Sequence, residues 1–200
     1  MKRVQVSFLA ALLVFTLAAI VNGGVFSEIP APPAIGATIE DFTLPDASGK
    51  EHSLNALKGK HGSVLIFVSV QCPVSNAYND RMEKLAQDYK ARGITLIGIN
   101  ANMTESADAV KSHAATNNLT FPILKDAGNK IADRLGATKT PEAYVLDGDN
   151  KLVYHGRIDN SKEPEGVNSS ELRDALDALL AGKPIAKTTA MAFGCTIKRG

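Results

Sequence analysis

The stretch VSVQCPVSNAYNDRM, residues 68–82, decides the fold. It begins in a β-branched apolar run over 63–70 that is typical of a buried central strand, and it ends in a helical pattern. Cys72 stands at the junction, and Pro73 occupies the first helical position, where a proline is well suited. Backbone N–H groups and the helix dipole favour the reactive thiolate there. On position alone, Cys72 is equally compatible with a small buried apolar residue.

Outward from this stretch, short apolar runs alternate with helical patterns. A hairpin is predicted over 41–54 with its turn at Ser48-Gly49, and one helix over 74–92 with a stop at Gly93. Further strands are predicted over 94–99, 121–124, 143–146 and 152–158, and further helices over 104–118, 129–135 and 169–179. The turn DGDN at 147–150 makes the last two strands antiparallel. This order predicts an α/β domain, with a mixed sheet covered by helices on both faces.

The N-terminus has the layout of a secretory leader. Two basic residues, Lys2 and Arg3, precede a mostly apolar run over 4–21 and then small residues. We expect residues 1–24 to be a signal peptide and the mature protein to be exported, either periplasmic or secreted. The apolar run is long for a leader and no A-x-A site follows it, so an uncleaved N-terminal anchor is the alternative. Contact with a membrane is expected only in that case.

The chain is expected to hold one folded domain. The proline-rich residues 25–34 form a linker, residues 35–184 form the domain, and residues 185–200 form a C-terminal tail that carries the second cysteine, Cys195. Export would place both cysteines in a compartment where disulfides persist. The tail lacks the apolar periodicity that would dock it, so we expect it to be mobile.

Charge and motifs exclude several function classes. The 22 basic and 21 acidic side chains give a net charge of +1, so the chain has no strong electrostatic footprint for nucleic acid. It contains no P-loop, no G-x-G-x-x-G and no G-x-S-x-G motif. The four histidines show no zinc-binding spacing, and neither cysteine has a second cysteine nearby. We therefore expect no cofactor and no metal.

Two motifs carry a family resemblance. The motif CPVS at 72–75, between strand and helix, and the motif TPE at 140–142, directly before another strand, resemble the thioredoxin fold of the redoxins. These are the alkyl hydroperoxide reductase/thiol-specific antioxidant, or peroxiredoxin-like, family, and the resemblance extends over about 35–184. It implies a thioredoxin-like fold, a cis peptide bond before Pro141 and a reactive Cys72. It also implies a disulfide or peroxide as substrate and an external thiol as reductant.

The sequence also departs from this family's patterns. Thioredoxins have a second cysteine where Ser75 stands, a tryptophan where Gln71 stands and a buried aspartate where Ile66 stands. Peroxiredoxins have a proline where Leu65 stands and a Thr or Ser where Ser69 stands, so half of that motif is present. They also use an arginine near the strand after the TPE motif, and none stands there. Thiol–disulfide exchange and peroxide reduction both remain open.

Ser75 cannot resolve a mixed disulfide or a sulfenic acid on Cys72, and Cys195 is the other thiol in the chain. We therefore predict an exported thiol oxidoreductase with Cys72 and Cys195 as catalytic residues; a permanent Cys72–Cys195 bridge is the alternative. The residues predicted to position the substrate or the thiolate are Ser69, Ser75, Thr140 and Pro141. A different class of function is a non-catalytic binding or copper-handling module, in which Cys72 is a ligand or a structural half-cystine.

Overall fold

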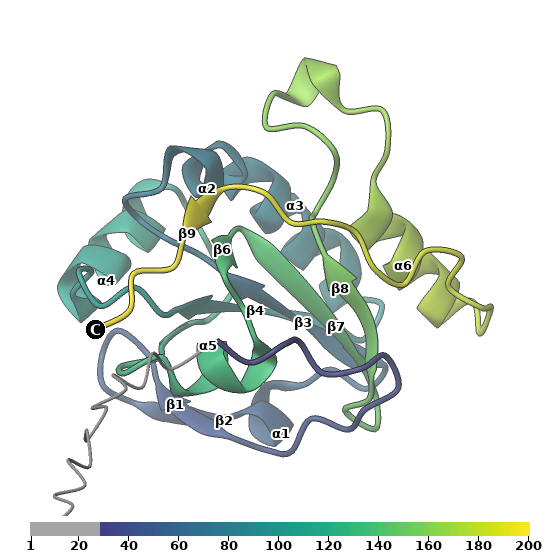
Figure 1. Ribbon diagram of the computed structural model, residues 1–200, viewed down its shortest axis with the longest axis horizontal. Coiled ribbons are helices and arrows are strands. Elements are labelled where there is room, and N and C mark those ends of the chain that lie inside the picture. Colours follow the sequence, from purple (N-terminus) through teal and green to yellow (C-terminus); the bar gives the residue numbers. More distant parts are fainter. Residues whose placement is uncertain (1–28) are drawn as a thin grey trace, which may run out of the picture.

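A computed structural model describes residues 29–200, so the predicted leader and the first part of the linker lie outside the described residues. Within this range a five-stranded mixed sheet forms the centre of the molecule (Figure 1). Its strands run in the order β5 (Ile123–Lys125), β4 (Ile94–Asn100), β3 (Gly62–Phe67), β7 (Glu142–Asp147) and β8 (Leu152–Gly156). Strands β4 and β5 are parallel, whereas β7 is antiparallel to β3 and to β8. The predicted mixed sheet and antiparallel final pair are confirmed.

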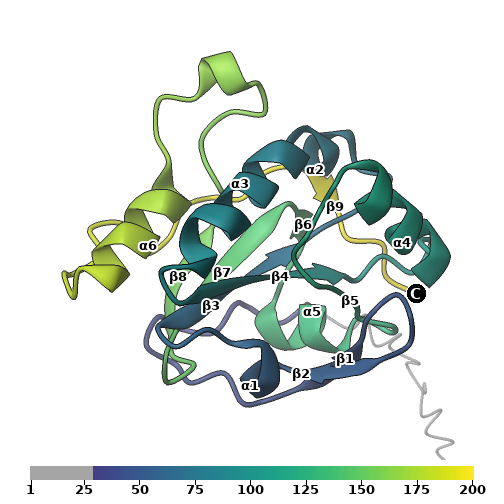
Figure 2. The same cartoon turned by 180° about the vertical axis from the view of Figure 1, so that it is seen from behind.

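Helices cover both faces of this sheet (Figure 2). Val64 and Ile66 of β3 belong to the core that also holds buried side chains of α3 (Asn79–Lys90), α4 (Ala107–Thr116) and α6 (Glu171–Leu180). Leu65 and Phe67 belong to the opposite core, with α5 (Lys130–Leu135), α1 (Leu54–Leu57) and the hairpin of β1 (Thr43–Pro45) and β2 (Glu51–Ser53). Burial on both faces explains why β3 is a continuous apolar run.

The helix predicted over 74–92 is in fact two helices, and this corrects the prediction. Helix α2 (Pro73–Ala77) ends at Tyr78, and α3 begins at Asn79. The Tyr78 N–H bonds to the carbonyl of Ser75 at 3.0 Å, an i to i−3 bond that tightens the turn. The Tyr78 hydroxyl donates to Asp159 Oδ1 at 2.7 Å, so the break places this buried ring against the loop after β8. Figures 1 and 2 show that this loop, which includes η1 (Pro164–Gly166), projects from the body.

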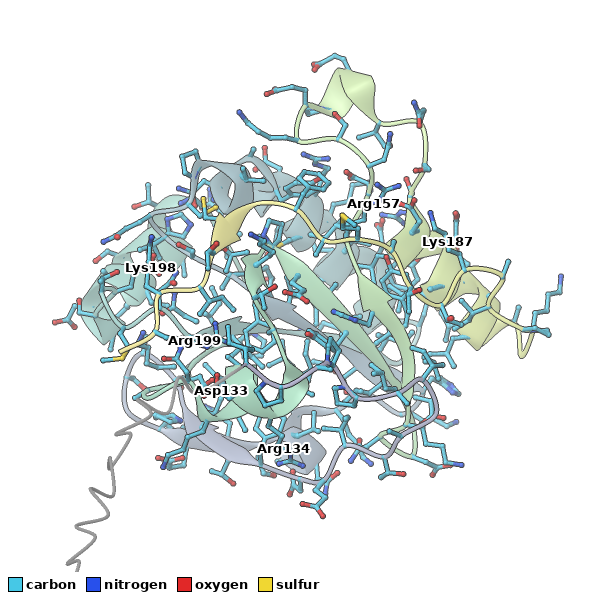
Figure 3. All side chains as sticks on the ribbon, viewed as in Figure 1. Asp133, Arg134, Arg157, Lys187, Lys198 and Arg199 are labelled. Atoms are coloured by element: carbon cyan, nitrogen blue, oxygen red, sulfur yellow. The ribbon has the colours of Figure 1, made fainter. Side chains whose placement is uncertain are left out.

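The C-terminal tail is docked on the domain, which overturns the expectation of a mobile segment. Strand β9 (Cys195–Thr196) pairs antiparallel with β6 (Lys139–Thr140), beside α2 (Figure 1). The Ile197 side chain is 3% exposed and joins the α5-side core. Figure 3 shows Arg199 next to Asp133, and their Nε and Oδ1 atoms lie 2.8 Å apart. The buried Ile197, the partly buried Ile185, Ala190 and Phe193, and the backbone pairing dock this segment without a regular apolar period.

Every helix within residues 29–200 is too short or too polar to cross a bilayer.

Candidate active site

Cys72 lies at the strand-to-helix junction, as predicted from the sequence. It is the N-cap residue of α2, and its Sγ accepts a hydrogen bond from the Ser75 N–H at 3.3 Å. The same sulfur lies 3.3 Å from the carbonyl oxygen of Thr140. Cys72 is 2% exposed, so in this conformation a substrate has almost no direct access to its sulfur.

Cys195 lies directly against Cys72. It faces Thr140 in the register of β9 and β6, and Thr140 is also the residue whose carbonyl oxygen lies 3.3 Å from the Cys72 sulfur. Both cysteines are free thiols, so the two sulfurs are adjacent without being bonded. The approach requires a glycine at 194, where φ is +137° and an added Cβ would lie 2.1 Å from the carbonyl oxygen of Thr140.

The two thiols have opposite shifts in acidity. Burial raises the pKa of Cys72, but hydrogen bonds from the Cys195 thiol and the Ser75 N–H outweigh it, and the net pKa lies below the ordinary value. Burial raises the pKa of Cys195, and the hydrogen bond to Cys72 raises it further. Cys72 is therefore the first of the pair to ionise, with Cys195 as the neutral donor beside it.

The predicted positioning residues meet at this site. Ser75 Oγ accepts the backbone N–H of Ser69 at 3.1 Å, so the two predicted serines hold each other. Ser69 Oγ accepts the backbone N–H of Cys72 at 3.1 Å. Thr140 carries the backbone contacts to both cysteines, and the predicted cis bond between Thr140 and Pro141 is present. The structure thus brings together all six residues predicted from the sequence.

Two buried carboxylates at the site were missed by the sequence analysis. Glu105 accepts the Ser69 hydroxyl at 2.5 Å from below the Cys72 loop. Burial raises the pKa of Glu105, but the hydrogen bonds from Ser69 and Asn100 outweigh it and the net pKa is lowered. The sequence offered one signal, the segment 104–106, which was interpreted only as a helix start; the helix is capped by Ser106 instead.

Glu142 is the second missed carboxylate, and it follows the cis proline directly. It accepts the backbone N–H groups of Thr138 and Lys139, both at 2.8 Å, and lies 2.7 Å from His155 Nε2. Burial raises the pKa of Glu142, but the hydrogen bonds with His155, Lys139 and Thr138 together outweigh it and the net pKa is lowered. Glu142 therefore fixes the segment that holds Thr140 opposite Cys195.

Few side chains in the described part of the chain are grouped as metal ligands would be. No group of three or more His, Cys, Asp or Glu side chains is placed to hold an ion within residues 29–200. Cys72 and Cys195 are neighbouring thiols, and thiolates are the soft ligands that copper(I) prefers. The chemistry that the site does support is the making and breaking of sulfur–sulfur bonds.

Comparison with known proteins agrees with this chemistry. Residues 35–155 match the model of the AhpC/TSA family. The chain is 32% identical over 129 residues to the thiol-disulfide oxidoreductase ResA of Bacillus thuringiensis (strain Al Hakam), covering 64% of this chain and 73% of that protein. It is also 32% identical over 140 residues to the chloroplastic peroxiredoxin Q of Sedum lineare, with coverages of 64% and 72%.

A solved structure matches a larger share of the chain. The hypothetical protein SMc02350 from Sinorhizobium meliloti 1021 superposes with a TM-score of 0.78 at 32% identity, covering 84% of this chain and 96% of that chain. No activity is assigned in the name of that protein, so the match bears on the fold. Together with the family match, these findings show that the chain belongs to the AhpC/TSA family and is an oxidoreductase of thioredoxin-like fold.

Proposed function

We propose that this protein is an exported thiol–disulfide oxidoreductase in which Cys72 is the nucleophile and Cys195 is the resolving thiol. The observation that carries the proposal is that two free cysteines meet at Thr140, whose carbonyl oxygen lies 3.3 Å from the Cys72 sulfur and which pairs with Cys195 across β6 and β9. The pKa of Cys72 is lowered and that of Cys195 is raised. Two-step disulfide exchange requires one thiol that ionises first and attacks the substrate, and a second thiol nearby that stays protonated until it attacks the mixed disulfide.

The reaction has two balanced steps. The Cys72 thiolate attacks one sulfur of the substrate disulfide, forms a mixed disulfide, and releases the other substrate sulfur, which takes up a proton. Cys195 then loses its proton and attacks the Cys72 sulfur, which breaks the mixed disulfide and releases the second substrate thiol. Two electrons pass from the protein to the substrate, and an external thiol reductant returns them by the same chemistry in reverse.

The hydrogen bonds of Ser69 favour a disulfide over a peroxide as substrate. The hydroxyl hydrogen of Ser69 is directed at Glu105, and the oxygen accepts the backbone N–H groups of Gln71 and Cys72. Because a hydroxyl has one hydrogen to donate, Ser69 has none left for a peroxide bound at Cys72. Peroxide reduction is therefore proposed as a slower reaction of the same thiolate.

The experiment compares the two substrates on one protein. The mature protein is supplied with a thiol reductant and with either oxidised glutathione or hydrogen peroxide, and turnover is measured for wild type and Cys72→Ser. We expect faster turnover of the disulfide and loss of both activities in Cys72→Ser. Faster turnover of peroxide, or activity that survives in Cys72→Ser, would overturn the assignment.

The copper-handling alternative predicts copper(I) binding without turnover of either substrate. A binding module would take up one copper(I) ion tightly through Cys72 and Cys195 and would turn over neither substrate. Titration of the reduced protein with copper(I) against a competing chelator, beside the turnover assay, separates the two functions.

The proposed domain organisation is consistent with thiol–disulfide exchange by an exported protein. We assign residues 1–24 to a signal peptide or an N-terminal anchor, 25–34 to a linker, 35–184 to the redoxin domain and 185–200 to a tail that supplies Cys195. Export suits a protein whose thiols exchange with disulfides, because disulfides persist outside the cytoplasm.

A further inference from the structure

The Glu105 carboxylate sits at the centre of a hydrogen-bond network that the two-step reaction above leaves unused. It is 2% exposed, and it lies between the loop that carries Cys72 and the end of strand β4. Within the described residues its donors are Ser69 Oγ at 2.5 Å, the backbone N–H groups of Val70 and Gln71 at 3.1 Å each, Asn100 Nδ2 at 2.5 Å and Asn102 Nδ2 at 3.1 Å. An ionised carboxylate can accept all of these bonds.

One branch of the network leads to Cys72. Glu105 receives the N–H groups of Val70 and Gln71 directly. It receives the hydroxyl of Ser69, whose oxygen in turn accepts the N–H of Cys72 at 3.1 Å. Three consecutive backbone N–H groups, ending at the cysteine, are thus fixed by one carboxylate, either directly or through one hydroxyl.

The other branch leads to Cys195. The Asn102 amide donates to Glu105 through Nδ2, and its Oδ1 accepts the backbone N–H of Lys198 at 2.6 Å. The N–H of Met103 donates to the carbonyl of Lys198 at 3.0 Å, so the tail is paired on both sides of that residue. Lys198 follows Cys195 by three residues, just beyond strand β9. The same carboxylate therefore fixes the tail that presents the second thiol.

Lys125 supplies a positive charge close to the buried Glu105 carboxylate. Its Nζ donates to Asn100 Oδ1 at 2.7 Å, on the side of that amide away from Glu105, and to the backbone carbonyl of Asn102 at 2.6 Å. A buried carboxylate with this many donors is often retained for the conformation that it specifies rather than for net stability. Replacing it by a neutral amide would place an NH₂ group against backbone N–H donors, so at least one bond in a branch would break.

We propose that Glu105 is a positioning residue that aligns Cys72 with Cys195, acting through Ser69 on the first and through Asn102 on the second. It touches neither sulfur. The inference rests on the proposed function, because alignment matters only if the two thiols form a disulfide. Its measurable consequence is the effective concentration of Cys195 toward Cys72, which depends on how closely the two thiols are held.

The test uses Glu105→Gln, with Glu83→Gln as the matched control. Glu83 also clamps a loop, through the Thr120 N–H at 2.7 Å and its hydroxyl at 2.6 Å, but no branch leads from it to either cysteine. The full mature chain is equilibrated with buffers of reduced and oxidised glutathione, and the fraction with a Cys72–Cys195 disulfide gives the effective concentration. We expect about a tenfold or larger fall for Glu105→Gln and less than about twofold for Glu83→Gln, because one lost charged hydrogen bond has that magnitude.

A second variant keeps the test decisive if Glu105→Gln does not fold. Asn102→Ala cuts only the tail branch, so the effective concentration is expected to fall while the rate of the first attack of Cys72 on oxidised glutathione stays within about twofold of wild type. If both variants bridge as readily as Glu83→Gln, the positioning role is wrong and the proposed function stands. If wild type forms no Cys72–Cys195 disulfide at all, the proposed function fails and the inference falls with it.

Discussion

At the scale of single residues, the acidity of Cys72 depends on its neighbour. The Cys195 thiol and the Ser75 N–H are the donors that offset the burial of Cys72 and bring its pKa below the ordinary value. Ser75, which stands where thioredoxins have a second thiol, donates its backbone N–H to the Cys72 sulfur and accepts the Ser69 N–H at its hydroxyl. The reactivity of one cysteine is thus set by a residue more than a hundred positions away.

Removing the Cys195 donor is expected to raise the pKa of Cys72. In Cys195→Ala the stabilising thiol is gone, so the pH profile of Cys72 alkylation by iodoacetamide should move to higher pH than in wild type. Cys195→Ser keeps a hydroxyl donor at the same place and serves as the control, with a smaller move. Identical profiles for wild type and Cys195→Ala would show that the thiol contact does not tune Cys72.

Glu142 gives a prediction about stability and pH. Its pKa is lowered in the fold, so its stabilisation is present above the unfolded pKa of about 4.3 and is lost as the pH falls through the folded value. Glu142→Gln should reduce the free energy of unfolding by about 1–3 kcal/mol at pH 7, because the bonds to Thr138, Lys139 and His155 weaken. Urea unfolding under reducing conditions should show this difference shrinking below about pH 4. A difference that stays constant from pH 7 to pH 3 would contradict the role of its charge.

At the scale of elements, β9 and β6 form the contact that joins the two thiols. Two short strands, each of two residues, bring Cys195 opposite Thr140, and Ile197 anchors them in the core. Gly194 allows the approach, because any side chain there would meet the Thr140 carbonyl. The docking of the tail therefore depends on Gly194 and Ile197, together with Phe193, which packs against Tyr78.

Gly194→Ala is expected to displace the tail. The added Cβ would lie 2.1 Å from the Thr140 oxygen, and the backbone φ of +137° is unfavourable for alanine, so docking should weaken by roughly 1–3 kcal/mol. Amide hydrogen exchange at Ile197, whose N–H bonds to Thr138, should become about tenfold faster or more. Gly182→Ala is the control, since its φ is +62° but nothing lies within 4 Å of the new Cβ. Equal exchange in the two variants would mean that the close approach at Gly194 is unimportant.

Much of the element order follows from local patterns, and the exceptions have physical causes. The run at 63–70 predicted β3, and the helical spacing after Pro73 predicted one helix where the structure has α2 and α3, because burial on both faces and capping leave local signatures. The break at Tyr78 depends on a contact with Asp159, which lies far along the chain. Docking of the tail depends on the pairing of β9 with β6 and on burial of apolar side chains such as Ile197. Neither feature repeats regularly along the sequence, so no hydrophobic pattern predicts it.

Some residues of the candidate site were predictable from the sequence, and others were not. Cys72, Cys195 and the Thr140-Pro141 pair were found because sulfur chemistry and a family motif mark them in the sequence. Glu105 and Glu142 were not, because an acidic residue near a loop or a helix start usually faces solvent. Only the fold shows that each is buried and surrounded by donors.

At the scale of the whole molecule, a single domain over residues 29–200 closes its C-terminus over its own reactive cysteine (Figure 1). The tail crosses the domain from α6 to the far side of β6, and Figure 3 shows Arg199 at its end beside Asp133. We expect the tail to move aside when a substrate disulfide reaches Cys72, because Cys72 is 2% exposed and Cys195 of the tail pairs with Thr140 beside it.

Export is the prediction that concerns the chain as a whole. The basic start and the apolar run over 4–21 should direct the protein out of the cytoplasm, and mass spectrometry of the exported form should find an N-terminus near residue 25. Recovery of the intact chain in the membrane fraction would favour the uncleaved anchor instead. An intact N-terminus in the soluble cytosolic fraction would contradict export in either form.

The central claim, attack by Cys72 and resolution by Cys195, is tested most directly by one single-turnover measurement. Reduced wild type, Cys195→Ala and Cys72→Ala are each mixed with oxidised glutathione, quenched with acid over time and mapped by mass spectrometry. We expect wild type to pass through a glutathione adduct on Cys72 and end with a Cys72–Cys195 disulfide, Cys195→Ala to stop at the adduct on Cys72, and Cys72→Ala to react slowly. If wild type also stops at the adduct, or if the first adduct forms on Cys195, the account is contradicted.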